Sequence, residues 1–159
     1  MPTPFDPVLE AQRNWQQRGW ESASQGMATV TSLVRIGALL SVQADAILRP
    51  FGISFSRYEL LTLLMFSRSG ALPMKKASSR LNIPPASVTH MVTALEKDGL
   101  VSRSRDPKDG RGILVSITDQ GIALVSSATP ALNEFFESLN VQPNLLAELT
   151  AFRRTLGDA

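Results

Sequence analysis

The chain has 159 residues, 43% hydrophobic and 19% charged, which is typical of a single globular domain with a substantial core. It contains no cysteine and one histidine, which excludes disulfides, thiol redox chemistry, cysteine-ligated zinc and a histidine-centred metal cluster. The net charge is only +2, but nine cations and four anions lie between Arg68 and Arg111, a local charge of +5 against an acidic remainder. This basic centre favours a phosphate-bearing partner, although a solvated charged surface is the alternative.

The N-terminus places Pro, Asp and Glu before any apolar run and lacks the basic stretch and apolar core of a secretory signal. No segment approaches the ~20 uninterrupted apolar residues that span a bilayer. We therefore expect a soluble, cytoplasmic protein with no membrane partner.

The first predicted element is a short amphipathic helix from Val8 to Gly19, which carries Trp15 and is expected to lie on the main body as an addition. A long helix follows from about Ala28 to Leu48. Its apolar residues spread around much of the helical circumference, which predicts burial on more than one side. Pro50 and Gly52 end it.

The next helix is expected to begin at Ser56, because Ser56 and Glu59 have the spacing in which each side chain caps the other residue's backbone N–H. Ser69-Gly70 stops it. A short third helix, Met74–Leu81, follows; its cations are Lys75, Lys76 and Arg80.

A fourth helix is predicted from Pro85, which suits the first helical position, to Lys97, with Gly99 as its terminator. One narrow stripe consists of Val88, Met91, Val92 and Leu95. The opposite side carries Ala86, Thr89, His90, Thr93 and Lys97, with Ser87 near the start. Two helices joined by a tight turn, the second held by an apolar stripe, are typical of a helix-turn-helix that reads the major groove; a plain surface helix is the alternative.

Two strands, Leu100–Arg105 and Arg111–Ile117, are expected to form a hairpin with Pro107 and Gly110 at its bend. Its cations are Arg103, Arg105, Lys108 and Arg111. Asp106 and Asp109 are expected to cap the turn and to pair with the arginines. An arginine at such a tip suits the narrow minor groove, so the hairpin is interpreted as a wing rather than as a solvated basic loop.

Thr118 with Asp119 opens a long helix, which Pro130 must kink or restart. A last helix from about Pro143 places apolar residues at three- and four-residue spacing: Leu145, Leu149, Phe152 and Leu156. Little core remains for this stripe to cover. We expect it to pair with a second copy of the chain, with docking on its own chain as the alternative.

The predicted fold class is mainly α with a small antiparallel β wing, a winged helix-turn-helix lobe with a helical lobe. The residues expected to contact DNA are Lys75, Lys76, Ser87, Thr89, His90, Thr93, Lys97, Arg103, Arg105, Lys108 and Arg111. Those expected to shape the wing are Asp106, Asp109 and Gly110.

The run Val88–Val101 (VTHMVTALEKDGLV), followed by Arg103, Asp106-Pro107, Asp109, Arg111, Ile117-Thr118 and Gly121, closely resembles the MarR family of winged-helix regulators. The resemblance implies that the first, fifth and sixth helices of the family fold form a dimer interface, that the fourth helix reads the major groove, and that Arg111 is the wing arginine. It divides the chain into an N-terminal extension (1–25), a dimerisation helix (26–52), the DNA-binding lobe (53–118) and C-terminal dimerisation helices (119–159). The family usually has Asp-Arg-Arg where this chain has Asp109-Gly110-Arg111, so the wing loses one cation.

The resemblance also implies an effector. A urate-responsive branch of the family lines its pocket with residues that correspond here to Trp15, Glu59, His90 and Arg103, although His90 replaces that branch's arginine. Glu59 and Trp15 also have plain roles in capping and packing. More generally the family binds aromatic or phenolic anions, for which Arg35, Phe51, Tyr58 and Met65 are candidate lining residues.

These features predict a homodimeric regulator, a repressor released by a small aromatic anion, that binds a pseudo-palindromic operator in double-stranded DNA. It requires no cofactor. An adaptor that has lost DNA contact is the alternative. No catalytic constellation emerges, because a single histidine lies in a cationic helix and no paired carboxylates or phosphate-binding glycine loop accompany it.

Overall fold

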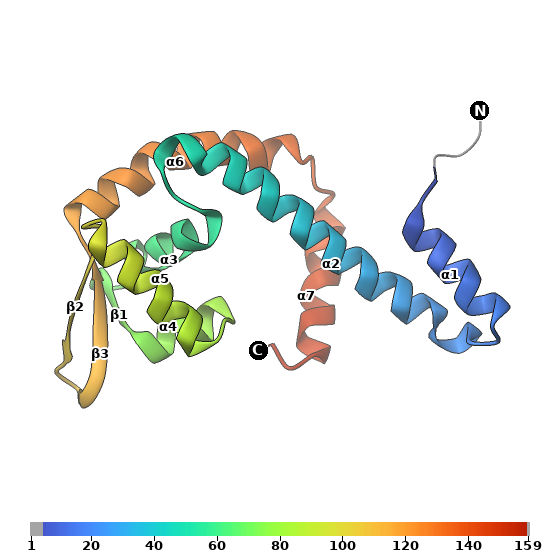
Figure 1. The fold of residues 1–159 in the computed structure, drawn as a ribbon, viewed down its shortest axis with the longest axis horizontal. Coiled ribbons are helices and arrows are strands. Elements are labelled where there is room, and N and C mark those ends of the chain that lie inside the picture. The colour runs from blue at the N-terminus through green and yellow to red at the C-terminus, as the bar shows by residue number, and fades with distance from the viewer. Residues whose placement is uncertain (1–4, 159) are drawn as a thin grey trace. The chain divides into compact units, whose positions relative to one another are not determined.

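The computed structural model describes residues 5–158; residues 1–4 and 159, which belong to the predicted N-terminal extension and C-terminal segment, lie outside the described residues. The chain divides into two compact units, residues 1–46 (unit 1) and 47–159 (unit 2). The predicted class, mainly α with a small antiparallel sheet, is confirmed (Figure 1).

Unit 1 consists of α1 (Pro7–Gln17) and most of α2 (Glu21–Leu48), joined by a turn at Gly19, whose φ is +82°. The Asp6 carboxylate caps α1 by accepting a hydrogen bond from the Val8 N–H at 2.8 Å. The rings of Trp15 and Trp20 meet edge to face, 5.3 Å between centroids, and fix α1 against the start of α2. Helix α2 therefore begins at Glu21, well before the predicted start.

The prediction that α2 is buried on more than one side is wrong for the single chain. Val34 and Val42 are 69% and 68% exposed, and Ala44 is among its few buried residues. The helical run 21–51 has a mean hydropathy of 1.4 in its most apolar stretch, which makes it long and apolar enough to cross a membrane by length and composition. The expectation that no segment approaches this limit overlooked it, because Arg35 and Asp45 interrupt the apolar run.

Unit 2 contains the remaining elements. They are the 3-10 turn η1 (Arg49–Phe51), α3 (Phe55–Met65), β1 (Ala71–Pro73), α4 (Met74–Leu81), α5 (Pro85–Lys97), β2 (Val101–Asp106), β3 (Asp109–Ile117), α6 (Asp119–Ser138) and α7 (Pro143–Thr155). The predicted bounds of α4 and α5 are confirmed. Pro130 lies inside a continuous α6, so the predicted restart does not occur.

The start of α3 differs from the prediction. The helix begins at Phe55 with Ser54 as the N-cap residue, and the Ser54 side chain makes no capping hydrogen bond. Ser56 is therefore inside the first turn, where it cannot form the predicted capping box with Glu59. The Ser56 hydroxyl instead lies 3.3 Å from the hydroxyl of Ser54.

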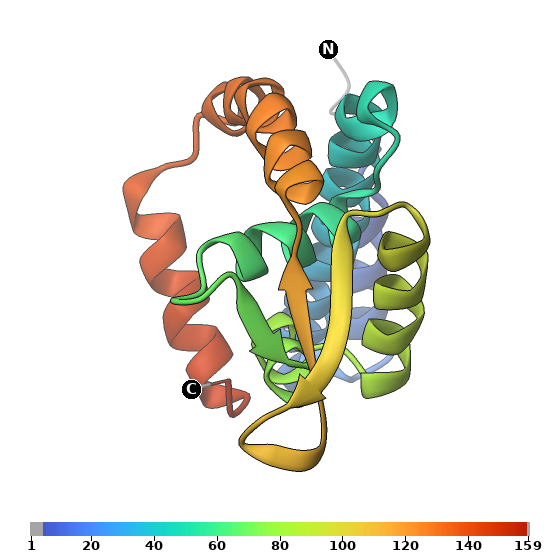
Figure 2. The same cartoon turned by 90° about the vertical axis from the view of Figure 1, so that its left-hand side faces the viewer.

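The sheet of unit 2 has the antiparallel order β1-β3-β2. The sequence did not reveal β1, because three residues ending at Pro73 carry no alternation; it pairs with β3 through Ala71 opposite Ser116. Figure 2 shows the β2–β3 hairpin extending beyond the end of β1. Val115 is buried in β3, whereas Ile113 is 43% exposed, so the predicted apolar face covers the core only near the base of the hairpin.

The core of unit 2 is formed by one side each of α3, α5 and α6 together with β3 and the last residues of α2. Its largest fully buried side chains are Leu48, Leu60, Leu61, Leu64, Val88, Val92, Leu95, Val115, Val125 and Leu132. Helix α7 contributes no buried residue, and Leu156 at its end is 72% exposed. One side of α5 and the base of the hairpin are thus packed on the core. The apolar stripe on α7 is not covered by any described residue.

Candidate nucleic-acid interface

Helices α4 and α5 are joined by a tight turn that the chain itself stabilises. Asn82 adopts a left-handed conformation at the end of α4, with φ at +51°. The Ser78 hydroxyl donates to the carbonyl oxygen of Ile83 at 2.6 Å, and the Ile83 N–H donates to the carbonyl oxygen of Ser78. This turn places Pro85 at the first position of α5, as predicted.

Helix α5 presents the expected outward face. Val88, Val92 and Leu95 are buried, while its polar residues are exposed: Ser87, Thr89, His90, Thr93 and Lys97. The hydroxyl of Thr89 donates to the Pro85 carbonyl oxygen at 3.0 Å, and that of Thr93 donates to the Thr89 carbonyl oxygen at 2.9 Å. In this arrangement both threonine hydroxyls keep their acceptor capacity, and Ser87 and His90 are exposed with donor groups of their own.

The hairpin loop is shaped by two carboxylates. Asp106 is buried and accepts from the Lys108 N–H at 2.9 Å, and Asp109 accepts from the Arg111 N–H at 3.2 Å. The predicted capping role is confirmed. Neither carboxylate forms an ion pair with an arginine in the described part of the chain, so the predicted pairing is wrong and the guanidinium groups are left for other partners.

The two glycines of the hairpin differ in how much space surrounds them. A Cβ built on Gly112 would lie 3.2 Å and 3.3 Å from the Cβ atoms of Asp106 and Asp109, so a side chain there is crowded between the two capping residues. A Cβ on Gly110 would meet no described atom within 4 Å, and its φ is outside the left-handed region. Gly110 lies in β3 rather than at the bend where the prediction placed it, and the backbone there permits an arginine.

Arg103 has a different environment from the other wing cations. Its Nε donates to Glu96 Oε2 at 2.8 Å, its Nη2 reaches the same oxygen, and its backbone N–H donates to Glu96 Oε1. This pairing joins β2 to the end of α5 and lowers the pKa of Glu96, chiefly through the Arg103 side-chain hydrogen bond. Arg103 thus holds the wing against the recognition helix, which competes with its predicted contact to DNA.

The structure brings several predicted DNA-binding residues together in unit 2. A cleft of about 210 Å³ separates the start of α5 from the hairpin, and its lining includes Lys75, Thr89, Asp106, Asp109 and Arg111. The exposed cations Lys76, Lys97, Arg105 and Lys108 lie on the same three elements, α4, α5 and the hairpin, outside this lining. We call this cleft, together with the exposed polar side of α5 and these cations of α4, α5 and the hairpin, the reading face.

The candidate ligand-binding residues do not form one described site. Trp15 and Arg35 belong to unit 1, whereas Phe51, Tyr58, Glu59 and Met65 belong to unit 2. Tyr58 is buried, and its hydroxyl lies 2.7 Å from that of Thr129 on α6, so it has a structural partner. Burial raises the pKa of Glu59, whose side chain has no described cation beside it.

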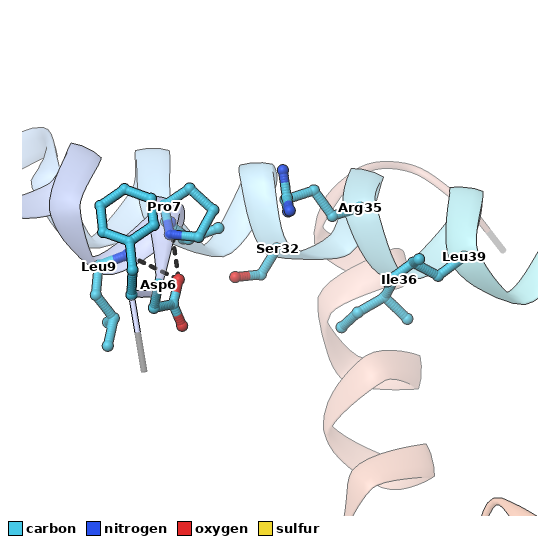
Figure 3. Close-up of a pocket in the computed structure, with 9 residues that line it drawn as sticks. Asp6, Pro7, Leu9, Ser32, Arg35, Ile36 and Leu39 are labelled. Carbon is cyan, nitrogen blue, oxygen red and sulfur yellow. Dashed lines mark hydrogen bonds between the residues drawn. The ribbon is translucent and has the colours of Figure 1, made fainter. Parts of the chain in front are cut away.

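Unit 1 has a cleft of its own (Figure 3). Its volume is about 570 Å³, and it lies between the start of α1 and the middle of α2. Ser32, Arg35, Ile36 and Leu39 line one side at helical spacing, and Leu9 faces them from α1. Trp15 does not line it, because its ring packs on Trp20. The lining also includes the Asp6 carboxylate, which caps α1, so the cleft combines an apolar wall with one cation and one anion.

One cation near the reading face was not among the predicted site residues. Arg57, in the first turn of α3, lines a cleft together with Ser87 and His90 of α5. The prediction considered the basic segment only from Arg68 onward. No local pattern marks Arg57, because its proximity to α5 arises from the packing of two helices that are separated by β1 and α4.

Comparisons with known proteins agree with this geometry. Residues 55–113 match the model of the MarR family. An uncharacterized HTH-type transcriptional regulator of Bacillus subtilis, YdgJ, is 32% identical over 88% of this chain and 80% of its own length. The crystal structure of Sco5413, a MarR family transcriptional regulator from Streptomyces coelicolor, is 39% identical, covers 83% of this chain and 92% of its own, and has a TM-score of 0.72.

A third relative is described with its ligand. Sco3205, a MarR family transcriptional regulator from the same organism, was solved in complex with DNA; it is 25% identical, covers 82% of this chain and 87% of its own, and has a TM-score of 0.74. The matched relatives are regulators, not enzymes. The helix-turn-helix, the hairpin and these similarities together show that the chain belongs to the MarR family of DNA-binding transcriptional regulators.

Proposed function

We propose that the chain is a cytoplasmic, homodimeric repressor that binds a pseudo-palindromic operator through its reading face. The observation that carries the proposal is the cleft in which Arg111, Lys75 and Thr89 converge, because it joins a wing cation to the first turns of the recognition helix. A helix in the major groove with an adjacent arginine in the minor groove would use both sets of residues. The DNA complex of the relative Sco3205 supports this reading.

Gel-shift titration on the DNA upstream of the chain's own gene tests the proposal. We expect a specific complex on a site whose half-sites lie about one helical turn apart, roughly 10 bp. If the protein binds this DNA weakly, and no more tightly than unrelated DNA of the same length, autoregulation is contradicted. Heparin should compete with the complex, because phosphate contacts supply much of the affinity. An adaptor without DNA contact would be indifferent to heparin.

Replacing Arg111 by alanine should weaken operator binding and flatten its salt dependence. Each phosphate contact contributes about 0.9 to the slope of log K against log salt, so the loss should be about one unit for each bound protomer. Asp109 and Gly112 keep the loop in shape without the arginine side chain, so the variant should fold normally. An unchanged slope would refute the wing assignment.

The opposite substitution, Gly110→Arg, adds a cation to the wing and is the matched test for a gain in DNA affinity. A side chain at position 110 meets open space, so the variant should tighten binding and steepen the slope by a similar amount. Gly112→Arg is the control at a crowded position, where a Cβ would come within 3.2 Å and 3.3 Å of the Cβ atoms of Asp106 and Asp109, and it should gain less affinity. Equal binding by both glycine variants would show that added charge acts non-specifically.

The dimer is proposed on the exposed apolar surfaces of both units. In α2, Val30, Val34 and Val42 are more than half exposed, and in α7, Leu146 and Leu156 are 67% and 72% exposed. Exposed apolar stretches of this extent mark interaction surfaces. A second copy also accounts for the high hydropathy of α2 without a membrane.

We further propose that a small aromatic or phenolic anion releases the repressor, with the unit 1 cleft as its site. Arg35 forms no described ion pair, Ile36 and Leu39 beside it supply an apolar wall, and the Asp6 carboxylate in the same lining already accepts hydrogen bonds from the start of α1. In a thermal-shift screen of aromatic acids, urate included, a ligand at a hundred times its Kd should raise the free energy of unfolding by about 2.7 kcal/mol.

Ligands found in this screen should also abolish the gel shift. Arg35→Gln should remove the response but retain DNA binding; a variant that still responds would exclude this site.

A further inference from the structure

A second cleft borders α5 on the side of Arg57. It has a volume of about 450 Å³, and its walls come from the first turn of α3, the helix-turn-helix turn and α5. The residues that matter for its chemistry are Ser56, Arg57, Ser87, His90, Met91 and Ala94. We call it the α3–α5 cleft.

The α3–α5 cleft and the wing cleft lie on opposite flanks of the recognition helix. At about 100° per residue, Pro85 and Thr89, which line the wing cleft, point in nearly one direction. Ser87 and Ala94, which line the α3–α5 cleft, point roughly 180° away from that direction. The buried Val88 occupies one of the two directions between them, and the exposed His90 and Thr93 occupy the other.

A helix in the major groove has a phosphate backbone on each side, because the groove is only about 12 Å wide. On the wing flank, Lys75 and Arg111 supply cations. On the other flank, Arg57 is the cation. It is half-buried, so its stem is supported, and it forms no ion pair with any described residue. The described lining of the α3–α5 cleft contains no carboxylate to oppose an anion.

We infer that Arg57 binds a DNA phosphate on the backbone strand across the recognition helix from the wing. The planar guanidinium suits the bidentate recognition of phosphate, and the Ser87 hydroxyl and the His90 ring border the same cleft as further donors. The recognition helix is then gripped from both flanks, which fixes its depth and rotation in the major groove. This inference rests on the proposed DNA-binding function and adds a contact outside the helix-turn-helix and the wing.

Salt titrations of operator binding by the full-length protein test it. The probe is an operator selected from a random 30-bp duplex pool with the wild-type chain. Arg57→Gln should lower the slope by about 0.9 for each bound protomer and weaken binding roughly tenfold at 0.15 M salt. Arg57→Lys should restore most of the slope, because it keeps the charge, and should restore less of the affinity, because it loses the bidentate geometry.

The matched control is Arg68→Gln. Arg68 lies just after the C-terminal end of α3 and just before Ala71, which pairs with Ser116 at the end of β3 away from the wing loop. The substitution Arg68→Gln should therefore leave the salt slope unchanged. Operators with single neutral methylphosphonates then locate the phosphate. At one position, the methylphosphonate should weaken binding by the wild type but not by Arg57→Gln. A second position should affect the wild type but not Arg111→Ala, and the two positions should lie on opposite strands.

The outcomes separate the inference from the proposed function. If Arg57→Gln behaves like Arg68→Gln while Arg111→Ala loses slope, the α3–α5 cleft is not a phosphate site but the DNA-binding function stands. If Arg57→Gln loses slope and Arg57→Lys loses as much, a charge contact is refuted and the effect is structural. If the selection yields no specific operator, the proposed function fails and the inference fails with it.

Discussion

Replacing Gly121 by alanine is expected to destabilise unit 2 more than any other single-methyl addition to a glycine of the described chain. A Cβ at this position would lie well inside contact distance of the Leu100 carbonyl oxygen and 2.8 Å from Cγ1 of Ile117. The Leu100 carbonyl already accepts a hydrogen bond from the Thr118 N–H, so it cannot move away without loss. Overpacking against backbone outweighs the gain of about 1 kcal/mol from helix propensity, and we expect a net loss of about 2 kcal/mol.

Gly26→Ala is the matched control for this substitution. Gly26 also lies inside a helix, but a Cβ there would meet no described atom within 4 Å. It should gain up to about 1 kcal/mol of stability from helix propensity alone. Urea unfolding at one fixed protein concentration, followed by far-UV circular dichroism, measures both; fluorescence does not suffice, because both tryptophans lie in unit 1. If Gly121→Ala is as stable as the wild type, the close approach of α6 to β2 is wrong.

The second large effect concerns the apolar stripe of α7. Leu145, Leu149, Phe152 and Leu156 share one side of the helix, and Leu145 and Leu156 are 43% and 72% exposed. The double variant Leu145→Glu/Leu156→Glu places four charges at the proposed dimer interface. If each leucine contributes at least about 1 kcal/mol, the dimer dissociation constant should rise roughly a thousandfold.

Sedimentation velocity should then find monomers at concentrations where the wild type is dimeric, and the specific gel shift should be lost because one protomer reaches only one half-site. Ala147→Glu adds one charge to each protomer on the opposite side of α7, where the side chain is exposed, and should change neither result. A double variant that remains dimeric would place the interface elsewhere.

Local chemistry made much of unit 2 predictable. Met74–Leu81 and Pro85–Lys97 are bounded by residues with a definite backbone preference, Asn82 and Pro85 among them, so their ends follow from the sequence. Thr118 caps α6 as expected, by accepting a hydrogen bond from the Gly121 N–H. The hairpin was predicted from two strand-like runs with Pro107 and Gly110 between them, although its second strand begins earlier, at Asp109.

The features that the sequence did not reveal depend on contacts between elements. The Glu96–Arg103 pair joins a helix to a strand, so the arginine looked as free as Arg105. The approach of Arg57 to α5 is of the same kind. The capping box failed because Ser54 and Ser56 are equally plausible N-caps by type, and the helix began at the earlier one. Residue type alone does not distinguish such alternatives; packing does.

The hydroxyl of Thr118 joins three parts of unit 2 at one point. It donates to the Gly99 carbonyl oxygen just past α5 and accepts from the Gly121 N–H in the first turn of α6, while its own backbone follows β3. The Glu96–Arg103 pair also joins β2 to α5. The recognition helix, the wing and the first turn of α6 are therefore expected to move together. In the proposed dimer, we therefore expect a movement of α6 to change the distance between the two recognition helices and to leave each helix-turn-helix and its wing unchanged.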